Sequence, residues 1–365
     1  MRLAFDLTAL HDRRTGVGAF AREVLTRVAR HDDIDVVGYS VSWRGRNVSD
    51  LGPAGVRVAT RPMAARPLRE LWRRFDWPPI TWWTGPVDVV HGPNFVVPPA
   101  HGAGALATVH DLTFIRYPEL CTPDVLQYGA LLRRAVRRGA HMHTVSQFVA
   151  DEVVDAFAVE SSRVHVVPNG VDPIEPGDAA VGCRLAGGDR YVLALGTIEP
   201  RKDLPSLVAA FDALAGADHE LRLIVAGQDG WGTNSFDQAA GRAHHRERIV
   251  RLGFVDDASR AALLAGASAF AYPSKYEGFG LAPLEAMAAG IPVVTTRTGA
   301  LPEVLGDAAR FVPPGAVDEL AAALAAVLDD SPARSALVTA GRARAARYSW
   351  DECADGIVRV YQRLC

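Results

Sequence analysis

The sequence predicts an α/β protein with two doubly wound domains, each a parallel sheet covered by helices on both faces. Three observations support this. The chain has 365 residues, more than one ordinary hydrophobic core serves, so two domains are expected. Short β-branched or apolar runs alternate with longer amphipathic segments, as in parallel sheets. The alternation pauses once, at 173–189, in a stretch rich in Pro, Gly and Asp.

This pause separates the two predicted domains. We expect 1–172 to form an N-terminal domain, 173–189 a linker and 190–349 a C-terminal domain, with a final helix at 350–365 that packs back on the N-terminal domain. Three of the expected helices cover Gly18–Arg30, Leu204–Leu214 and Ser259–Leu264. The expected strands are Arg2–Leu7, Asp35–Val41, Val87–Gly92, Leu106–Asp111 and Val164–Gly170 in the first domain, and Tyr191–Gly196, Arg222–Gly227, Ile249–Phe254, Ala269–Ser274 and Ile291–Thr296 in the second.

Composition and charge exclude several classes of protein. The formal net charge of −3 gives no bulk electrostatic attraction to nucleic acid. The four cysteines show no metal-binding spacing, which favours a reducing compartment without structural zinc. No apolar run reaches the roughly 18 residues of a membrane-spanning helix, and the N-terminal residues do not resemble a signal peptide. We therefore expect a cytoplasmic protein.

The segment SKYEGFGLAPLEAMAAGIPVV contains Glu277 and Glu285 after a predicted strand. Pro283 suits the first turn of a helix, which places Glu285 in that turn. Gly278 and Gly280 allow backbone N–H groups to approach a ligand at the positive end of the helix, which predicts an anion site suited to a diphosphate. A carboxylate there would repel phosphate unless it bound another part of the ligand, and two vicinal ribose hydroxyls suit it.

This segment resembles the donor-site signature of retaining glycosyltransferases of family 4, which have the GT-B fold. The resemblance covers nearly the whole chain through the further motifs TGVGAFAREV, HDLTFIRYPE, VSQFVADEV, VVPNGVD and GTIEPRKDL, which occur in the expected order. It implies two Rossmann-like domains that face each other across a cleft lined by the carboxyl ends of their strands. It also implies transfer of a sugar, with retention, from a nucleotide diphosphate sugar to a glycan or lipid-linked hydroxyl. The motifs look most like bacterial mannosyltransferases of surface-polysaccharide assembly, so GDP-mannose is the expected donor.

The resemblance assigns roles to individual residues of the C-terminal half. Glu285 inherits binding of the donor ribose, and Glu277 inherits a place beside the transferred sugar. The alternatives are a solvated loop carboxylate for Glu277 and a simple partner of the helix dipole for Glu285. Further expected donor contacts are Gly278, Phe279, Gly280 and Leu281 in the loop, with Phe254 and Val255 holding the base through backbone atoms.

Arg201 and Lys202 follow a predicted strand and precede a predicted helix. A leaving diphosphate needs a divalent metal or fixed cations, and a basic pair at a helix start is unfavourable without an anion. The resemblance assigns this pair to the diphosphate, so we expect no metal and no cofactor. The Asp-x-Asp at 33–35 precedes a strand instead of following one, and we interpret it as a polar strand entry.

The glycine-rich sequence RTGVGAF raises the alternative of a nicotinamide dinucleotide site. Nine residues separate Asp6 from Gly16, too long a gap for the tight turn of a dinucleotide fingerprint. We expect a longer loop in which Gly16 and Gly18 line the cleft, with a plain helix-leading loop as the alternative for Gly18. His110 follows a predicted strand and inherits a contact with the transferred sugar, while a loop anchor is its alternative.

Aromatic and basic residues alternate at 66–83, in RPLRELWRRFDWPPITWW. This pattern is typical of a peripheral membrane contact that would serve a lipid-linked acceptor. The alternative is a helix that buries Leu68, Leu71, Trp72 and Phe75 and exposes its arginines. Two other functions remain open. A sugar-nucleotide 2-epimerase of the same fold would convert its substrate without an acceptor, and a non-catalytic binding protein would bind the donor without turnover.

Overall fold

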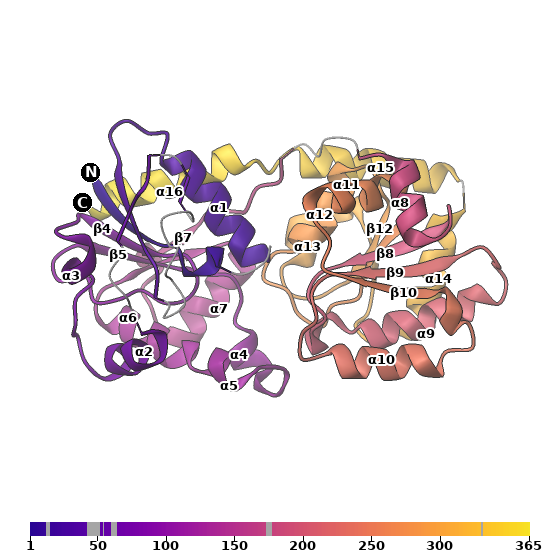
Figure 1. The fold of residues 1–365 in the computed structure, drawn as a ribbon, viewed down its shortest axis with the longest axis horizontal. Helices are drawn as coiled ribbons and strands as arrows, with labels where there is room; N and C mark the ends of the chain where they lie inside the picture. Colours follow the sequence, from indigo (N-terminus) through magenta and orange to yellow (C-terminus); the bar gives the residue numbers. More distant parts are fainter. Residues whose placement is uncertain (12–14, 42–51, 54, 60–63, 173–176, 330) are drawn as a thin grey trace. The chain divides into compact units, whose positions relative to one another are not determined.

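The computed structural model describes residues 1–11, 15–41, 52–53, 55–59, 64–172, 177–329 and 331–365. The chain divides into two compact units, Met1–Gly170 with Ser349–Cys365, and Val171–Tyr348 (Figure 1). The predicted linker is wrong over 179–186, which forms helix α8 (Ala179–Ala186) of the second unit. Asp178 caps this helix by accepting from two of its N–H groups, and Gly187 ends it in the left-handed region. Residues 173–176 lie outside the described part of the chain.

The first unit contains a seven-stranded sheet in the order β3-β2-β1-β4-β5-β6-β7, and each paired strand runs parallel to its neighbour. The strand order reverses between β1 and β4, so the carboxyl ends of these strands mark the place where such sheets bind ligands. The strands are β1 (Arg2–Asp6), β2 (Asp35–Tyr39), β3 (Arg57–Val58), β4 (Val89–Gly92), β5 (Gly104–Val109), β6 (His141–Thr144) and β7 (Val164–Val166).

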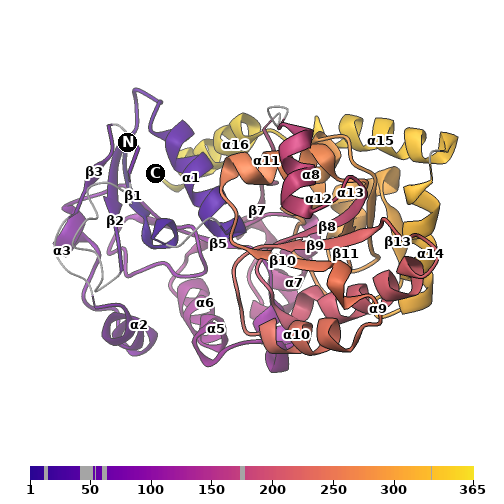
Figure 2. The same ribbon diagram turned by 45° about the vertical axis from the view of Figure 1, so that its right-hand side comes forward.

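Helices cover both faces of this sheet, with α1 and α16 on one face and α6 and α7 on the other (Figure 1, Figure 2). The helix α16 packs on α1, and an ion pair of 2.6 Å joins Arg27 Nε to Asp351 Oδ1 between them. The apolar face of α16 buries Ile357 and Tyr361 completely, which explains why it belongs to this unit. The helices are α1 (Gly16–Val28), α2 (Ala65–Arg74), α3 (Thr81–Thr84), α4 (Thr113–Arg116), α5 (Pro123–Leu126), α6 (Tyr128–Arg137), α7 (Gln147–Phe157) and α16 (Trp350–Leu364).

The region 66–83 only partly follows the buried-helix alternative. In α2, Leu68 and Trp72 are buried, and the Trp72 indole donates to the Pro78 carbonyl over 3.0 Å. Phe75 lies beyond the end of α2 and is 58% exposed, so its predicted burial is wrong. Trp77 and Trp82 are 51% and 53% exposed. No helix in the described part of the chain is long and apolar enough to cross a membrane.

A buried polar network crosses the first sheet. The His91 ring bonds to the Tyr361 hydroxyl over 2.6 Å and to Thr108 Oγ1 over 2.8 Å. Thr108 Oγ1 lies 2.9 Å from His143 Nδ1, and His143 Nε2 donates to the Val167 carbonyl over 2.9 Å. Burial lowers the pKa of His143 to about 3 and that of His91 well below its usual value, so both rings are neutral in the fold.

We expect the folded state to lose stability as pH falls below about 6.5, the ordinary histidine pKa. Below that pH, His91 and His143 become protonated in the unfolded chain but stay neutral in the folded state. This difference persists until the pH approaches the folded-state pKa of His143, which is about 3. Urea unfolding at about pH 7.5 and pH 5 measures the slope of the free energy of unfolding against pH. One histidine contributes about 1.4 kcal/mol per pH unit to this slope. His143→Gln should reduce the slope, whereas the exposed His219→Gln should not. Equal slopes in all three proteins would contradict the prediction.

The second unit contains a six-stranded sheet in the order β10-β9-β8-β11-β12-β13, also parallel throughout. Helices α9 and α10 cover one face, and α8, α11 and α12 the other (Figure 1, Figure 2). The strand order reverses between β8 and β11. The elements are β8 (Tyr191–Leu195), α9 (Leu204–Ala215), β9 (Arg222–Ala226), α10 (Thr233–Arg242), β10 (Ile249–Gly253), α11 (Asp257–Gly266), β11 (Ala269–Tyr272), α12 (Leu281–Ala288), β12 (Val293–Thr296), α13 (Leu301–Leu305), β13 (Arg310–Val312), α14 (Val317–Leu328) and α15 (Pro332–Ala345).

The predicted fold class is confirmed by these two sheets, although several strand ends differ. The strand β7 ends at Val166 and not at Gly170, because Pro168 has no N–H for a strand ladder. The sequence reading missed β3, β6 and β13. Of these, β6 has the polar sequence HMHT, whose His143 is accommodated by the buried network described above.

Candidate functional site

A partly buried charge cluster lies at the carboxyl edge of the second sheet, where the strand order reverses. Arg201 and Lys202 follow β8, and Glu277 follows its neighbour β11. Glu277 Oε1 lies 2.6 Å from Lys202 Nζ and 2.6 Å from Arg201 Nη1. Glu277 is only 5% exposed, so its interpretation as a solvated loop carboxylate is wrong. One carboxylate therefore holds both cations that the sequence singled out.

Three further groups complete this cluster, none of which the sequence reading named. Lys202 Nζ donates to the Tyr272 hydroxyl and lies 4.2 Å from the centre of that ring. Arg201 Nε donates to Glu199 Oε2 over 3.0 Å, and Arg201 Nη1 donates to the Tyr276 carbonyl over 3.2 Å. Within the described residues, Lys202 uses two of its three N–H donors, which leaves one for a ligand.

The charges of the cluster determine its protonation. Burial opposes the charge of Glu277, but Arg201 and Lys202 outweigh it and hold the Glu277 pKa at about 2. Burial and the charge of Arg201 lower the Lys202 pKa, while Glu277 and Glu199 act in the opposite direction. Burial and the charge of Glu277 raise the Tyr272 pKa well above its usual value. Glu277 is therefore ionised and Tyr272 protonated at neutral pH.

The backbone around Glu277 is fixed from two sides. The Lys275 N–H donates to the Arg201 carbonyl over 2.7 Å, and the Ala300 N–H donates to the Glu277 carbonyl over 2.9 Å. Gly299 has a φ of +54°, and a Cβ there would lie 2.2 Å from the Glu277 carbonyl oxygen. Only glycine fits this contact, so the loop and the cations are held in one arrangement.

The Gly278–Leu281 loop leads into α12, which begins at Leu281. Gly280 is the N-cap residue with a φ of +99°, and Phe279 is buried with its ring perpendicular to that of Tyr348. Glu285 is therefore in the second turn of α12, so its predicted place in the first turn is wrong. Its carboxylate forms an ion pair with Arg260 of α11. Phe254 and Val255 follow β10 at the same edge of the sheet, and Phe254 is exposed.

The first unit also places polar residues at the carboxyl edge of its sheet. His110 follows β5, and its Nε2 lies 2.8 Å from the Pro93 carbonyl. A carbonyl only accepts, so Nε2 carries the proton and Nδ1 remains as an acceptor without a partner among the described residues. Burial lowers the pKa of His110 against the opposing effects of the Pro93 carbonyl and Asp111, which favours the neutral ring.

The predicted glycine loop is wrong at Gly16 and Gly18, because both residues lie in the first turn of α1. The Thr15 hydroxyl caps this helix by accepting from the Gly18 N–H over 3.0 Å. A Cβ on Gly18 would lie 3.1 Å from the Ala9 carbonyl oxygen, so glycine lets the helix start pack against the turn after β1. Residues 12–14, which include the first residue of RTGVGAF, lie outside the described part of the chain.

A second polar group at this edge was missed by the sequence reading. Asp6 ends β1 beside Tyr39 of β2, and its Oδ1 accepts from the Thr8 N–H over 2.8 Å and from the Thr8 hydroxyl. Burial raises the Asp6 pKa to about 6. The buried Tyr39 hydroxyl has no hydrogen-bond partner among the described residues. Asp6, Thr8, Arg69 and Asn94 line a cavity of about 20 Å³, which holds one water-sized group.

Two doubly wound domains with such polar carboxyl edges define the GT-B class of fold. Residues 14–175 match the family model described as Glycosyltransferase Family 4, and residues 183–344 match the one described as Glycosyl transferases group 1. The chain belongs to the family 4 glycosyltransferases, which confirms the predicted family and an enzyme that transfers sugars.

Known proteins resemble the chain over three quarters of its length or more. The O-antigen chain mannosyltransferase B of Escherichia coli is 32% identical over 394 aligned residues, covering 100% of both chains. The MMP alpha-(1->4)-mannosyltransferase of Mycolicibacterium hassiacum is 33% identical and covers 76% of this chain and 71% of the relative. The crystal structure of WaaG, a glycosyltransferase involved in lipopolysaccharide biosynthesis, has a TM-score of 0.78 at 19% identity and covers 99% of each chain. This last likeness supports the fold alone.

Proposed function

We propose that the chain is a retaining glycosyltransferase that moves mannose from GDP-mannose to a glycan or lipid-linked hydroxyl. The observation that carries this proposal is the partly buried cluster of Arg201, Lys202 and Glu277 in a chain of family 4. The identity with an O-antigen chain mannosyltransferase along the full chain supports mannose as the sugar. Retention rests on family membership.

In this proposal, Arg201 and Lys202 hold the diphosphate and stabilise the charge that develops as it leaves. Two nearby carboxylates, Glu199 and Glu277, neutralise the charges of Arg201 and Lys202. The bound diphosphate therefore interacts with cations that also remain paired with these carboxylates. The remaining N–H of Lys202 and the positive charge of Arg201 supply the contact with the diphosphate. Glu277 keeps the cations in place and lies beside the transferred sugar.

The other donor contacts follow from the same edge of the second sheet. Glu285 accepts hydrogen bonds from the ribose hydroxyls, and Arg260 orients its carboxylate through their ion pair. The N–H groups of the Gly278–Leu281 loop approach the ligand at the start of α12. The backbone of Phe254 and Val255, after β10, holds the base.

The first unit supplies the groups for the sugar and the acceptor. His110 offers its Nδ1 to a hydroxyl of the transferred sugar, and Gly16 and Gly18 start the helix at the same edge of the sheet. In the transfer step the bond between the anomeric carbon and the phosphate oxygen breaks as the acceptor oxygen bonds to that carbon on the same face. The acceptor's proton passes to the leaving phosphate, so the step needs no enzymic nucleophile.

We also propose that the enzyme works at the cytoplasmic face of a membrane, with contact through 66–83. Phe75, Trp77 and Trp82 are exposed in this region, and Arg73 and Arg74 lie in the last turn of α2. Exposed aromatic rings beside cations suit the headgroup layer of a bilayer. Such contact would bring a lipid-linked acceptor to the enzyme.

An acceptor-dependent assay tests the proposed function. The purified chain is incubated with GDP-mannose, other nucleotide sugars, and glycan or lipid-linked acceptors, and release of nucleotide diphosphate is measured. We expect release that requires both a donor and an acceptor. Conversion of a nucleotide sugar in the absence of an acceptor would support the epimerase instead. Donor binding without turnover on any acceptor would support the binding protein.

We expect this turnover to be independent of divalent metal, because Arg201 and Lys202 provide the charge that a metal would otherwise supply. The measurement compares rates after extensive dialysis with and without a chelator. Equal rates are expected. Loss of activity that Mg²⁺ or Mn²⁺ restores would reject the assignment of the diphosphate to these two residues.

A further inference from the structure

The small cavity beside Asp6 lies where the first sheet reverses its strand order. Asp6 ends β1, and Asn94 follows β4, the neighbouring strand on the other side of the reversal. Open parallel sheets bind their ligands beyond the carboxyl ends of the strands at this point. The contacts proposed above come from the second unit, from His110 and from the start of α1. They leave this cavity without a role.

Two opposite charges line the cavity without meeting. Asp6 is 9% exposed, and its Oδ1 accepts from the Thr8 N–H and hydroxyl, while its Oδ2 has no partner within the described ranges. The Arg69 guanidinium forms no ion pair there either, and its Cζ lies 6.0 Å from the centre of the Tyr128 ring. Because both side chains line a cavity that holds one water-sized group, a single group placed there contacts both.

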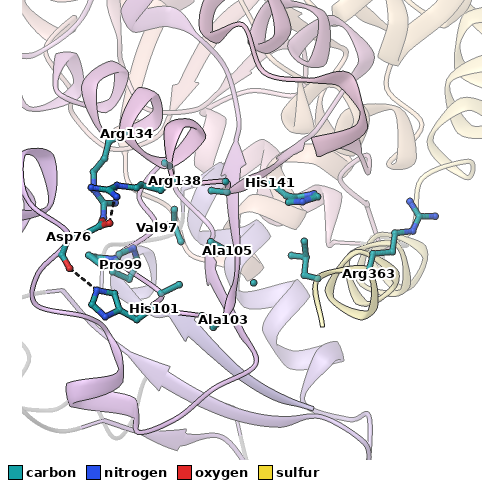
Figure 3. Close-up of a pocket in the computed structure, with 18 residues that line it drawn as sticks. Asp76, Val97, Pro99, His101, Ala103, Ala105, Arg134, Arg138, His141 and Arg363 are labelled. Carbon is teal, nitrogen blue, oxygen red and sulfur yellow. Dashed lines mark hydrogen bonds and ion pairs between the residues drawn. The ribbon is translucent and has the colours of Figure 1, made fainter.

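The larger cavity of this unit shows the contrasting case, in which the charges are already paired. It measures about 430 Å³ and lies at the amino ends of β5 and β6, away from the strand ends used in sugar transfer (Figure 3). There Asp76 pairs through one oxygen with Arg134 and through the other with Arg138 Nε, the latter over 2.9 Å. Both carboxylate oxygens of Asp76 are therefore used, whereas Asp6 keeps one for a ligand.

The turn after β4 holds its wall of the small cavity in a strained conformation. Phe95 has a φ of +61°, in the left-handed region that a residue with a side chain rarely adopts. The Phe95 N–H donates to the Thr108 carbonyl over 2.9 Å, and a Cβ on Gly92 would lie 1.8 Å from the Val96 carbonyl oxygen. These contacts fix the turn that carries Asn94. Backbone strain of this kind clusters at active and ligand-binding sites.

The same turn places the cavity beside His110. Pro93 lines the cavity, and its carbonyl accepts from His110 Nε2 over 2.8 Å. The Phe95 ring meets the His110 ring edge to face with their centres 6.0 Å apart. A ligand held at Asp6 is therefore next to the residue proposed to contact the transferred sugar.

Two tyrosines border the charged pair. The Asn94 side chain is hydrogen-bonded to the Tyr128 hydroxyl, and the Tyr128 ring stacks on Phe95 with their centres 4.8 Å apart. Tyr39 is paired with Asp6 in the sheet, and its buried hydroxyl has no partner in the described part of the chain. Buried polar groups are nearly always hydrogen-bonded, so an unpaired one is typical of a site that a ligand completes.

The chemistry of the charged pair selects a hydroxyl. A carboxylate only accepts hydrogen bonds and a guanidinium only donates them, so a group that joins the two must both donate and accept. A hydroxyl does so with a single oxygen. An ionised phosphate oxygen would suit Arg69 alone, and an ammonium would suit Asp6 alone. Sugar hydroxyls have the required chemistry.

We propose that Asp6 and Arg69 bind one hydroxyl of the acceptor, which donates to Asp6 Oδ2 and accepts from the Arg69 guanidinium. Thr8 positions the carboxylate by occupying its other oxygen. This inference rests on the proposed function, because it assigns a contact to the acceptor of sugar transfer. It makes Asp6 and Arg69 determinants of acceptor specificity, while the second unit binds the donor.

Binding of simple sugars tests this site without sugar transfer. The full chain is titrated at about pH 7.5 with the methyl glycosides of mannose, glucose, galactose and N-acetylglucosamine, and binding is followed by ligand-observed NMR. We expect at least one glycoside to bind. Asp6→Asn and Arg69→Gln should each lower its affinity by about tenfold or more, because each loses a charge-assisted hydrogen bond. Asp6→Asn keeps an oxygen for the two bonds from Thr8, so the local fold is retained.

The pH dependence of binding distinguishes a direct contact from a structural role. Burial raises the Asp6 pKa to about 6, against the opposing effects of Thr8 and Arg69. The other titratable groups near Asp6 are Tyr39 and Tyr128, whose raised pKa values keep them protonated. Since the ionised carboxylate is lost as pH falls, glycoside affinity should fall about fivefold between about pH 7.5 and pH 5. Asp6→Asn should abolish this dependence, which a structural role for Asp6 would not change.

Arg138→Gln is the matched control for Arg69→Gln. It removes the same charge from the same unit at the other edge of the sheet, where Arg138 is 61% exposed, and it should leave glycoside affinity unchanged. GDP is titrated into every variant and should bind equally, because the donor site belongs to the second unit.

The inference is overturned if none of the four glycosides binds, or if Asp6→Asn keeps the affinity and the pH dependence of the unaltered chain. It is also overturned if Arg138→Gln lowers the affinity as much as Arg69→Gln does, since that would reflect net charge alone. Transfer to an acceptor without any glycoside binding would reject this site and leave the proposed function standing. Glycoside binding that depends on Asp6, without transfer to any acceptor, would support the hydroxyl site and contradict the proposed function.

Discussion

Lys202→Ala should lower kcat by about 100- to 1,000-fold, as does removal of one preorganised donor to a developing negative charge. The Lys202 side chain is only 12% exposed and is bonded to Tyr272 and Glu277, so its ammonium is fixed before the donor binds. Its removal also leaves Glu277 paired with Arg201 alone. Steady-state rates with saturating donor and acceptor measure the effect, and Arg201→Ala should act in the same direction.

Lys275→Ala is the matched control for this prediction. Lys275 belongs to the same loop as Glu277, but its side chain is 42% exposed and pairs with Asp203 over 3.3 Å. Its removal should change kcat by less than about threefold, as expected for an exposed ion pair. Thermal unfolding of each variant checks that the fold is retained. Similar rate losses in Lys202→Ala and Lys275→Ala would show that the cluster has no special role at the diphosphate.

The fold was predictable because the chain alternates short apolar runs with amphipathic segments, and only parallel sheets accommodate that rhythm over so many elements. The linker was not, because Pro, Gly and Asp also mark helix ends. Asp178 and Gly187 cap the two ends of α8, a local use that composition does not distinguish from a linker. The strand β6 was missed because its histidines are polar, and the burial of His143 depends on hydrogen bonds to Thr108 of β5 and to the Val167 carbonyl.

The site was predictable as a set of residues but not as a geometry. Motifs identified Arg201, Lys202 and Glu277 separately, yet their ion pairs depend on β8 and β11 being neighbours in the sheet. Glu285 was placed one turn too early, since the helix start is set by Gly280 and not by Pro283. The ion pair of Glu285 with Arg260 joins two helices, and no local pattern predicts it.

Glu285→Ala should weaken binding of the free nucleotide diphosphate as well as of the intact donor. If the carboxylate accepts from the ribose hydroxyls, its loss costs about 1–3 kcal/mol, with charged partners toward the upper end. Arg260→Ala is the informative comparison, because it removes the ion pair and keeps the carboxylate. Calorimetric titration should show a smaller loss of nucleotide affinity for Arg260→Ala. Equal losses would mean that the ion pair, and not a ribose contact, accounts for the effect.

Glu277→Gln should lower turnover without lowering the affinity for the nucleotide diphosphate. The substitution keeps the shape of the side chain and removes a negative charge that lies 2.6 Å from both Arg201 and Lys202. Nucleotide diphosphate affinity should therefore stay the same or increase, because the cations face one carboxylate fewer. Turnover should fall by on the order of 100-fold, since the cations lose the group that fixes their position and the sugar loses its neighbouring carboxylate. A loss of nucleotide affinity equal to that of Glu285→Ala would show that the two roles are assigned wrongly. Unchanged turnover in both variants would contradict the transferase site itself.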